Sequence, residues 1–125
     1  MVTGFWSQLK RPILLLAPMA GVTDTAFRRI VSQYGKPDVC FTEFVSCAGL
    51  CSAGRERLLP DLWYHESERP VVAQIFGPEP EEYIETAKLC RDLGFDGIDI
   101  NFGCPDKNVD NEKTRVTILI FIVKK

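Results

Sequence analysis

Apolar residues along this chain form two kinds of pattern, short unbroken runs and longer stretches with helical spacing. The short runs predict strands at residues 13–16, 39–44, 71–76 and 97–100. The run at 13–16 has no alternation, which is typical of a parallel strand buried on both faces. The runs begin about 26 to 32 residues apart, the length that a strand, a right-handed crossover and the next strand require. The pattern therefore predicts four consecutive βα units.

Between these runs the apolar residues recur at helical spacing. Thr23 and Asp24 are placed to cap a helix that ends at Gly35. Its predicted buried residues are Phe27, Ile30, Val31 and Tyr34. A second helix starts near Pro80 and ends at Gly94. Its predicted buried residues are Tyr83, Ile84, Ala87, Cys90 and Leu93.

Three further segments are less regular. Residues 45–59 predict a helix despite two internal glycines, and residues 60–69 predict a loop. At the amino end, residues 1–11 predict a short amphipathic segment that covers the bottom of the core.

Four βα units in a row favour either a TIM (β/α)8 barrel or a doubly wound sheet. The loop after the first strand reads Pro18-Met19-Ala20-Gly21 and lacks the Gly-x-Gly-x-x-Gly of dinucleotide-binding sheets, which favours the barrel. A complete barrel needs about 250 residues, whereas this chain has 125. We therefore predict an α/β fold that is a partial TIM barrel, with the first four strands present and the carboxyl-terminal half absent.

Composition and charge narrow the class of protein. With 46% hydrophobic residues and a net charge of -2, the chain predicts a soluble globular protein without the basic surface typical of nucleic-acid binders. Its five cysteines are odd in number and irregularly spaced, which favours free thiols in a reducing cytoplasm. Cys47 and Cys51 lack further nearby ligands, so no metal site is predicted. The apolar run at 116–123 is far shorter than the ~20 residues that span a bilayer, so no membrane partner is predicted either.

Polar or chemically distinctive residues follow the carboxyl ends of the predicted strands. They are Pro18 and Met19, then Thr42 and Glu43, then Gln74, and finally Asn101 and Cys104. In a barrel these positions converge on one face, where active sites form. Each also has a purely structural interpretation: Met19 as packing, Glu43 as a capping or solvated carboxylate, and Gln74 as a partner for buried backbone.

Cys104 lies between Gly103 and Pro105 in a predicted loop, which is an unusual place for a packing cysteine. A cysteine thiol ordinarily titrates near ~8.5 and is mostly protonated at neutral pH, so it can act as a general acid as readily as a nucleophile. The single histidine, His65, precedes the third strand and is predicted to be a surface residue. The sequence therefore does not favour a Cys-His hydrolase. A buried structural thiol is the alternative.

Taken together, these motifs resemble the tRNA-dihydrouridine synthases. The similarity rests on Leu-Ala-Pro-Met-Ala-Gly-Val-Thr-Asp at residues 16–24, Thr-Glu at 42–43, Gln-Ile-Phe-Gly at 74–77 and Asp-Gly-Ile-Asp-Ile-Asn-Phe-Gly-Cys-Pro-Asp-Lys at 96–107. The resemblance implies a TIM barrel that binds FMN, uses NADPH as the reductant and reduces the C5=C6 bond of a uridine in tRNA. The uridine would have to leave the RNA stack to reach such a site.

The resemblance also implies roles for individual residues. Pro18, Met19 and Ala20 match a loop that contacts the flavin, and Gln74 matches a side chain that hydrogen-bonds the isoalloxazine. Asn101 matches an asparagine near flavin and uracil. Cys104 matches the cysteine that protonates C5 of the uracil.

The similarity stops after Val109, where the family continues with a glycine-rich segment and further strands. We therefore assign residues 1–109 to the amino-terminal half of an FMN-binding barrel and residues 110–125 to a divergent tail, expected to be the out-of-frame or truncated end of a longer gene. Two alternatives stay open. One is a non-catalytic half-barrel that assembles with itself or with a separate carboxyl-terminal half through its open strand edges. The other is a different FMN barrel oxidoreductase, such as a dihydroorotate dehydrogenase.

Overall fold

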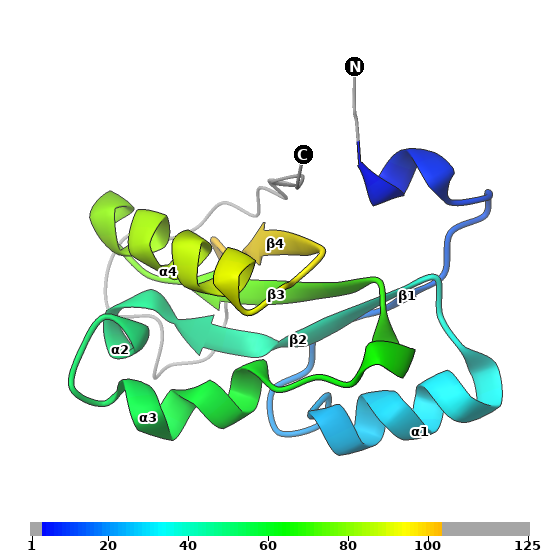
Figure 1. Cartoon of the computed structure of the whole chain (residues 1–125), viewed down its shortest axis with the longest axis horizontal. Helices are drawn as coiled ribbons and strands as arrows, with labels where there is room; N and C mark the ends of the chain where they lie inside the picture. Colours follow the sequence, from blue (N-terminus) through cyan, green and yellow to red (C-terminus); the bar gives the residue numbers. More distant parts are fainter. Residues whose placement is uncertain (1–3, 104–125) are drawn as a thin grey trace.

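Four parallel strands lie side by side in the order in which they occur along the chain (Figure 1). The computed structural model describes residues 4–103. Its strands are β1 (Leu15–Leu16), β2 (Val39–Ser46), β3 (Val71–Phe76) and β4 (Gly97–Ile100). A doubly wound sheet reverses its strand order at a switch point, whereas a barrel adds each strand beside the one before it. The order β1-β2-β3-β4 confirms the predicted α/β fold and agrees with the first four strands of a TIM barrel.

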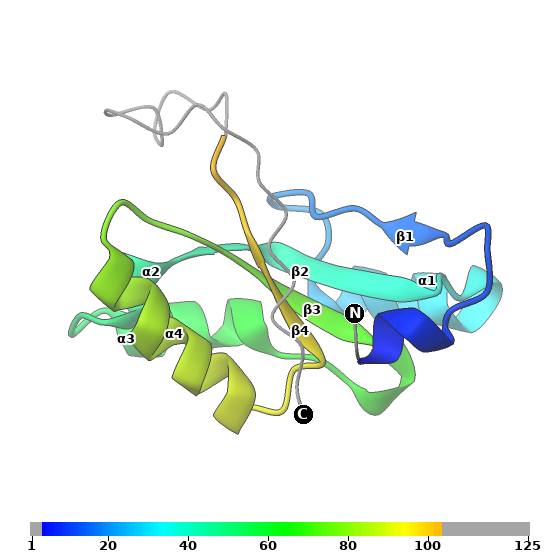
Figure 2. The same ribbon diagram turned by 90° about the horizontal axis from the view of Figure 1, so that it is seen from above.

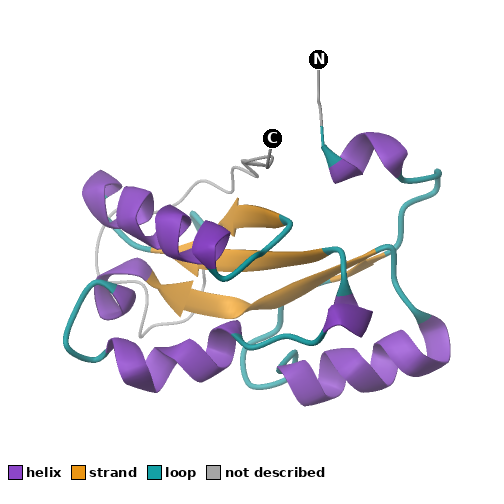
Figure 3. Cartoon of the chain, in the orientation of Figure 1, coloured by secondary structure: helices purple, strands orange, loops and turns teal. Residues whose placement is uncertain are grey.

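Helical segments connect successive strands (Figure 3). Between β1 and β2 lies α1 (Thr25–Gly35), and between β3 and β4 lies α4 (Pro80–Asp92). The connection from β2 to β3 holds four short segments: α2 (Cys47–Leu50), α3 (Arg55–Leu58) and the 3-10 helices η2 (Leu59–Leu62) and η3 (Glu66–Glu68). A further 3-10 helix, η1 (Phe5–Gln8), precedes β1.

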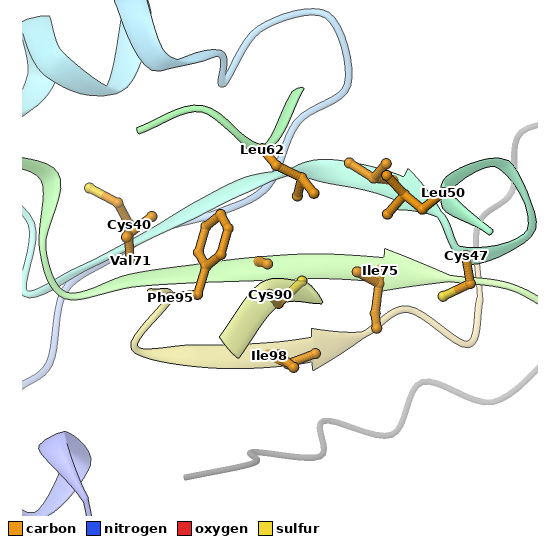
Figure 4. Close-up of a cluster of buried hydrophobic side chains, with 11 residues drawn as sticks. Cys40, Cys47, Leu50, Leu62, Val71, Ile75, Cys90, Phe95 and Ile98 are labelled. Atoms are coloured by element: carbon orange, nitrogen blue, oxygen red, sulfur yellow. The ribbon is translucent and has the colours of Figure 1, made fainter. Parts of the chain in front are cut away.

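Alternate residues of the strands contribute to two separate apolar clusters, as expected where successive side chains point to opposite faces of a sheet. The larger cluster joins one face of the sheet to α2, η2 and α4 (Figure 4). Its buried members are Cys40, Val45, Cys47, Leu50, Leu62, Val71, Ala73, Ile75, Cys90, Phe95 and Ile98.

The smaller cluster lies on the opposite face and consists of Val39, Phe41 and Val72. Phe5, Trp6 and Leu9 pack against it from the amino-terminal segment. The predicted covering role of this segment is therefore confirmed. In a barrel the face covered by the long helices is the outside, so the face with Val39 and Val72 is the inside.

The segment after β2 differs from the single predicted helix over residues 45–59. The strand continues to Ser46, whose hydroxyl accepts a hydrogen bond from the Gly49 N–H and so caps α2. α2 ends at Leu50, turns follow at residues 51–54, and α3 begins at Arg55. A Cβ at Gly49 would meet the end of the Leu58 side chain, so the absence of a side chain at Gly49 leaves room for Leu58 of α3 against α2. η2 and η3 then occupy the predicted loop.

The first strand was predicted to be buried on both faces, and this is wrong. β1 covers only Leu15–Leu16, and Leu14 and Leu15 are 66% and 49% exposed. The reason is position: β1 and β4 form the two edges of the sheet in the described residues, with β2 and β3 between them (Figure 2). An edge strand lacks a neighbour on one side, so an apolar run there is not enclosed.

The predicted cap of α1 is confirmed, but its predicted buried face is not. Asp24 Oδ1 accepts a hydrogen bond of 2.7 Å from the Phe27 N–H. However, Ile30 and Tyr34 are 59% and 83% exposed, and the buried residue of the helix is Arg28. Because β1 is an edge strand, no element within residues 4–103 lies beyond it to cover the apolar side of α1.

In α4 the prediction is confirmed for most of the apolar face. Cys90 is buried, and Tyr83 and Ala87 pack against the larger cluster. Ile84 and Leu93, also predicted to be buried, are exposed. Gly94 follows the helix with φ +86, a left-handed conformation that ends helices and favours glycine, as predicted.

Candidate functional site

The loop after β1 is a closed turn built around Met19 and Thr23. The Met19 carbonyl accepts hydrogen bonds from the N–H groups of Val22 and Thr23, at 3.1 and 3.0 Å. The Met19 N–H in turn donates to Thr23 Oγ1 at 2.9 Å. Thr23 is fully buried, whereas the Met19 side chain is 40% exposed. The turn thus presents Met19 outward on a backbone that Thr23 holds in place.

The same loop is tied to the next strand. Gly21, which has φ +69, donates its N–H to the Glu43 carboxylate. Glu43 belongs to the carboxyl half of β2, beside a shift in the β2–β3 register between Phe41 and Phe44. The structural alternative for Glu43 therefore has direct support, since its carboxylate binds a backbone N–H.

The register shift creates a contact between β2 and β3. Thr42 Oγ1 accepts a hydrogen bond of 3.1 Å from the Gln74 N–H and donates one of 2.8 Å to the Glu43 carbonyl. Thr42 is fully buried. It therefore supplies a partner to backbone that the interrupted strand pairing would leave unsatisfied.

Three polar side chains meet where β3 and β4 approach their carboxyl ends. Gln74 Nε2 donates to Asp99 Oδ2 at 2.5 Å, and Asn101 Nδ2 donates to Gln74 Oε1 at 3.4 Å. Asn101 Oδ1 then accepts from the Gly103 N–H at 3.0 Å. These three side chains are here called the amide chain: Asp99, Gln74 and Asn101. By strand alternation Gln74 and Asp99 lie on the same face as Val72, which is the inner face.

Asp99 is an unusual member of this group because it is a carboxyl group with only 2% of its surface exposed. Burial raises the pKa of Asp99 above its ordinary value, and hydrogen bonds from Gln74 and the Ile100 backbone partly oppose the shift. Within the described residues its Oδ1 atom is buried and has no hydrogen-bond partner. The site therefore contains a buried acceptor that no described residue satisfies.

The structure thus sorts the predicted site residues into groups. Gln74 and Asn101 are brought together by a direct hydrogen bond. Pro18, Met19 and Ala20 lie in the loop after β1, and in residues 4–103 no hydrogen bond joins that loop to Gln74 or Asn101. Cys104 lies outside the described residues. That these residues form one functional site therefore stays a prediction.

Sequence reasoning missed Asp99 as a site residue. A signal was present, because Asp99 is the only charged residue in the short apolar run Gly-Ile-Asp-Ile at 97–100. A charged side chain in a strand that is otherwise buried requires a partner. Without the fold, the identity of that partner, Gln74 on β3, is not visible.

Four cysteines fall within the described residues, and all are free thiols. Burial raises the pKa of Cys47 to about 11 and that of Cys90 to about 12, so both remain protonated and unreactive. His65 is exposed, as predicted, and its Nδ1 accepts from the Ser67 N–H at the start of η3. In the part of the chain that the structure describes, no cluster of three or more His, Cys, Asp or Glu side chains could hold a metal ion. No helix there has the length and apolar character needed to cross a membrane.

Comparison with known proteins shows the family of the chain. The sequence model of the dihydrouridine synthase (Dus) family matches residues 15–116. The chain belongs to the dihydrouridine synthase family. This match includes the loop after β1, the amide chain and the residues that follow β4, and it confirms the resemblance derived from the motifs.

Individual relatives agree with this assignment to the Dus family. The chain is 44% identical over 110 residues to the probable tRNA-dihydrouridine synthase 2 of Bacillus subtilis (strain 168). It is 46% and 44% identical over the same length to probable tRNA-dihydrouridine synthases of Staphylococcus aureus (strain COL) and Staphylococcus epidermidis (strain RP62A). Each alignment covers 87% of this chain and 34% of the relative. The chain therefore spans about a third of the length of the curated relatives it matches.

Proposed function

We propose that this chain forms part of a tRNA-dihydrouridine synthase, in which NADPH is the reductant, FMN the cofactor and a uridine of tRNA the substrate. The observation that carries the proposal is the amide chain, two hydrogen-bonded amides and a buried carboxyl group at the carboxyl ends of neighbouring parallel strands. In TIM barrels this end of the sheet is where substrates and cofactors bind. Family membership favours uridine over the dihydroorotate alternative.

The described residues fit the polar edge of a flavin ring. Such an edge carries carbonyl acceptors and a ring N–H donor. Gln74 and Asn101 offer amide N–H groups to the acceptors. Asp99 lies beside these amides, and its buried Oδ1 has no partner in the described residues. The exposed Met19 side chain offers an apolar surface on a turn whose backbone is hydrogen-bonded. The amide N–H groups of Gln74 and Asn101 thus have the chemistry that a heterocycle with carbonyl acceptors requires.

Within this proposal each residue has a distinct task. Gln74 binds the isoalloxazine, and the flavin is lined by Pro18, Met19 and Ala20. Asn101 contacts both the flavin and the uracil. When bound, FMN would supply hydride to C6 of the uracil after taking it from NADPH. Cys104 would donate the proton to C5, which balances the hydride and completes the saturated ring. We place the reaction in the cytoplasm, in keeping with the free thiols of the chain.

Dihydrouridine formation tests this function directly. The 125-residue chain is expressed in bacteria whose own dihydrouridine synthases have been deleted, and nucleosides from total tRNA are measured by mass spectrometry. We expect dihydrouridine in this strain and none with Cys104→Ala. The Bacillus subtilis relative serves as the positive control. No dihydrouridine from the chain, with a positive control that works, would contradict activity of the chain by itself.

Flavin binding separates the cofactor site from the reaction. Titration of FMN against the purified chain, followed by flavin fluorescence, should show saturable binding that Gln74→Ala weakens about tenfold, the effect of losing one or two hydrogen bonds to the ligand. Gln33→Ala is the matched control, since Gln33 is an exposed amide on α1. Equal losses of FMN affinity in both variants would contradict the proposal that Gln74 binds the flavin.

A second candidate function is a half-barrel that associates with another copy through its strand edges. It is favoured by the exposure of Leu14 and Leu15 at the β1 edge and of Ile30 on α1. Light scattering after size exclusion would show a dimer near twice the chain mass of 14.1 kDa. Leu15→Lys should shift that dimer to monomer, since a charge at an exposed strand edge opposes pairing. A monomeric wild-type chain at high concentration would rule this candidate out.

A further inference from the structure

Within the described residues Asp99 leaves one carboxyl oxygen without a hydrogen-bond partner, unlike Asp96, a carboxylate whose contacts stabilise the fold. Burying a carboxyl group is costly unless its oxygens find partners. Asp96, directly before β4, has partners for both oxygens: Arg69 Nη1 at 2.8 Å and the Val71 N–H at 2.9 Å. Asp99 is more deeply buried, has no ion pair in residues 4–103 and leaves Oδ1 without a partner. We therefore looked for the role of Asp99 in its effect on the hydrogen bonds of neighbouring side chains, and not in stability.

What Asp99 does to its neighbours follows from hydrogen-bond chemistry. An ionised carboxylate only accepts hydrogen bonds, whereas an amide has a donor on one side and an acceptor on the other. Contact with Asp99 therefore turns the nitrogen of Gln74 toward β4 and its oxygen toward Asn101. The Asn101 nitrogen must then face Gln74, which leaves the Asn101 oxygen to accept from the Gly103 N–H.

We propose that Asp99 is a positioning residue that sets the orientation of the Gln74 and Asn101 amides and, through them, holds the backbone at Gly103. In this arrangement each amide nitrogen keeps one N–H that no described residue uses. Both amides therefore present a donor to a bound ring, and the ligand that fits has acceptor atoms such as ring carbonyl oxygens. Without the carboxylate either amide could turn and present its oxygen instead. The identity of that ligand rests on the proposed function, but the orientation itself does not.

A pair of variants separates orientation from packing. Asp99→Leu keeps a similar volume and removes both acceptors, whereas Asp99→Asn keeps one acceptor oxygen. Nuclear magnetic resonance on the full 125-residue chain would follow the side-chain amides of Gln74 and Asn101 and the hydrogen exchange of the Gly103 N–H. In Asp99→Leu we expect both side-chain signals to shift and Gly103 to exchange about fivefold faster or more, as for the loss of one hydrogen bond. Asp99→Asn should restore most of the wild-type values.

A second variant covers the case in which Asp99→Leu does not fold. Gln74→Met interrupts the amide chain one step further along, and it should raise Gly103 exchange by a similar factor. Unchanged Gly103 exchange and unchanged Asn101 signals in either folded variant would overturn the proposal. Asp96→Asn is the control, since it removes a carboxylate at the start of the same strand and should leave Gly103 exchange as in the wild type.

FMN affinity then tests the consequence for the ligand. We expect Asp99→Leu to bind FMN about tenfold more weakly and Asp99→Asn to bind within about twofold of the wild type. Equal affinity in Asp99→Leu would overturn the role of Asp99 in presenting the amides. Failure of the wild-type chain to bind FMN would count against the proposed function alone, and the Gly103 measurement would still decide whether Asp99 positions the amide chain.

Discussion

The two ends of the sheet use buried polar residues in different ways. At the amino ends of β3 and β4, Asp96 bridges Arg69 and the Val71 backbone, and Arg69 also donates to Tyr64 and to the Gly94 carbonyl. Every charged group there has its partners. Toward the carboxyl ends, Asp99 makes one hydrogen bond to another side chain, and within residues 4–103 its buried Oδ1 has no partner. The two ends therefore differ in that the charged groups at the amino end are paired, whereas a buried carboxyl oxygen toward the carboxyl end has no partner among the described residues.

Arg28 and Glu68 are a second example of buried charged groups that have their partners, here between two helices. Both are fully buried and form an ion pair of 2.6 Å. Arg28 also donates to the carbonyls of Thr23 and Trp63 at 2.6 Å each, and Glu68 accepts from the Thr25 hydroxyl and the His65 N–H. The pair thus ties α1 to η3 with its hydrogen-bonding groups satisfied, which is the condition under which a buried ion pair is tolerated.

The largest effect is expected when this pair is broken. Arg28→Met leaves the Glu68 carboxylate buried without its charge partner and should lower the free energy of unfolding by about 3–5 kcal/mol. Urea denaturation followed by circular dichroism measures this change. Arg29→Met, at the exposed neighbouring position, should stay within about 0.5 kcal/mol of the wild type. Similar losses of unfolding free energy in the two variants would show that the ion pair between Arg28 and Glu68 does not stabilise the fold more than an exposed arginine does.

A smaller loss is expected at Asp96. Its partner Arg69 is partly exposed, with 30% of the side chain accessible, so solvent weakens the ion pair. Asp96→Asn should therefore cost about 1–2 kcal/mol in the free energy of unfolding, the range for hydrogen bonds to a charged group. Asp99→Asn, measured by the same denaturation, should cost less at neutral pH. If Asp99→Asn lost more unfolding free energy than Asp96→Asn, Asp99 and not Asp96 would be the carboxylate that contributes more to stability.

A substitution at Gly94 tests the contribution of backbone conformation to stability at the amino ends of β3 and β4. It has φ +86, and an added Cβ would lie 3.0 Å from the Tyr64 hydroxyl. Gly94→Ala should lower the free energy of unfolding by about 1 kcal/mol or more, because alanine is strained in this conformation. Gly35→Ala on α1, where the added Cβ meets nothing within 4 Å, is the control and should be neutral or slightly stabilising. Thermal melting of both variants gives the comparison.

The smallest effect is expected in the pH dependence contributed by Asp99. Burial raises the pKa of Asp99 in the folded state above its ordinary value of 3.8. Between these two pKa values the folded chain holds the proton while the unfolded chain has released it, so stability from this group falls as pH rises. The Asp99→Asn variant lacks this pH-dependent loss, so its unfolding free energy minus that of the wild type should rise with pH above 3.8 and level off past the folded pKa, whatever the sign of the difference at low pH. A difference that stays constant over this range would contradict the raised pKa.

The sequence alone was sufficient for the four strands, their parallel order and the family, because these depend on local apolar runs, on helix-length spacing and on contiguous motifs. It was also sufficient for the caps of the helices, since Asp24 and Gly94 act on neighbouring backbone. Gln74 and Asn101 could be named as candidates for the same reason, because each lies in a short motif.

Only the tertiary structure decided which residues meet across the chain. The apolar spacing of α1 predicted burial, but whether a helix face is covered depends on elements outside the helix, and here Arg28 is buried in place of Ile30. The partners Glu68 of Arg28 and Gln74 of Asp99 are 40 and 25 residues away along the chain. Such contacts arise from how the strands and helices pack, and no local pattern of residue types encodes the packing of elements so far apart.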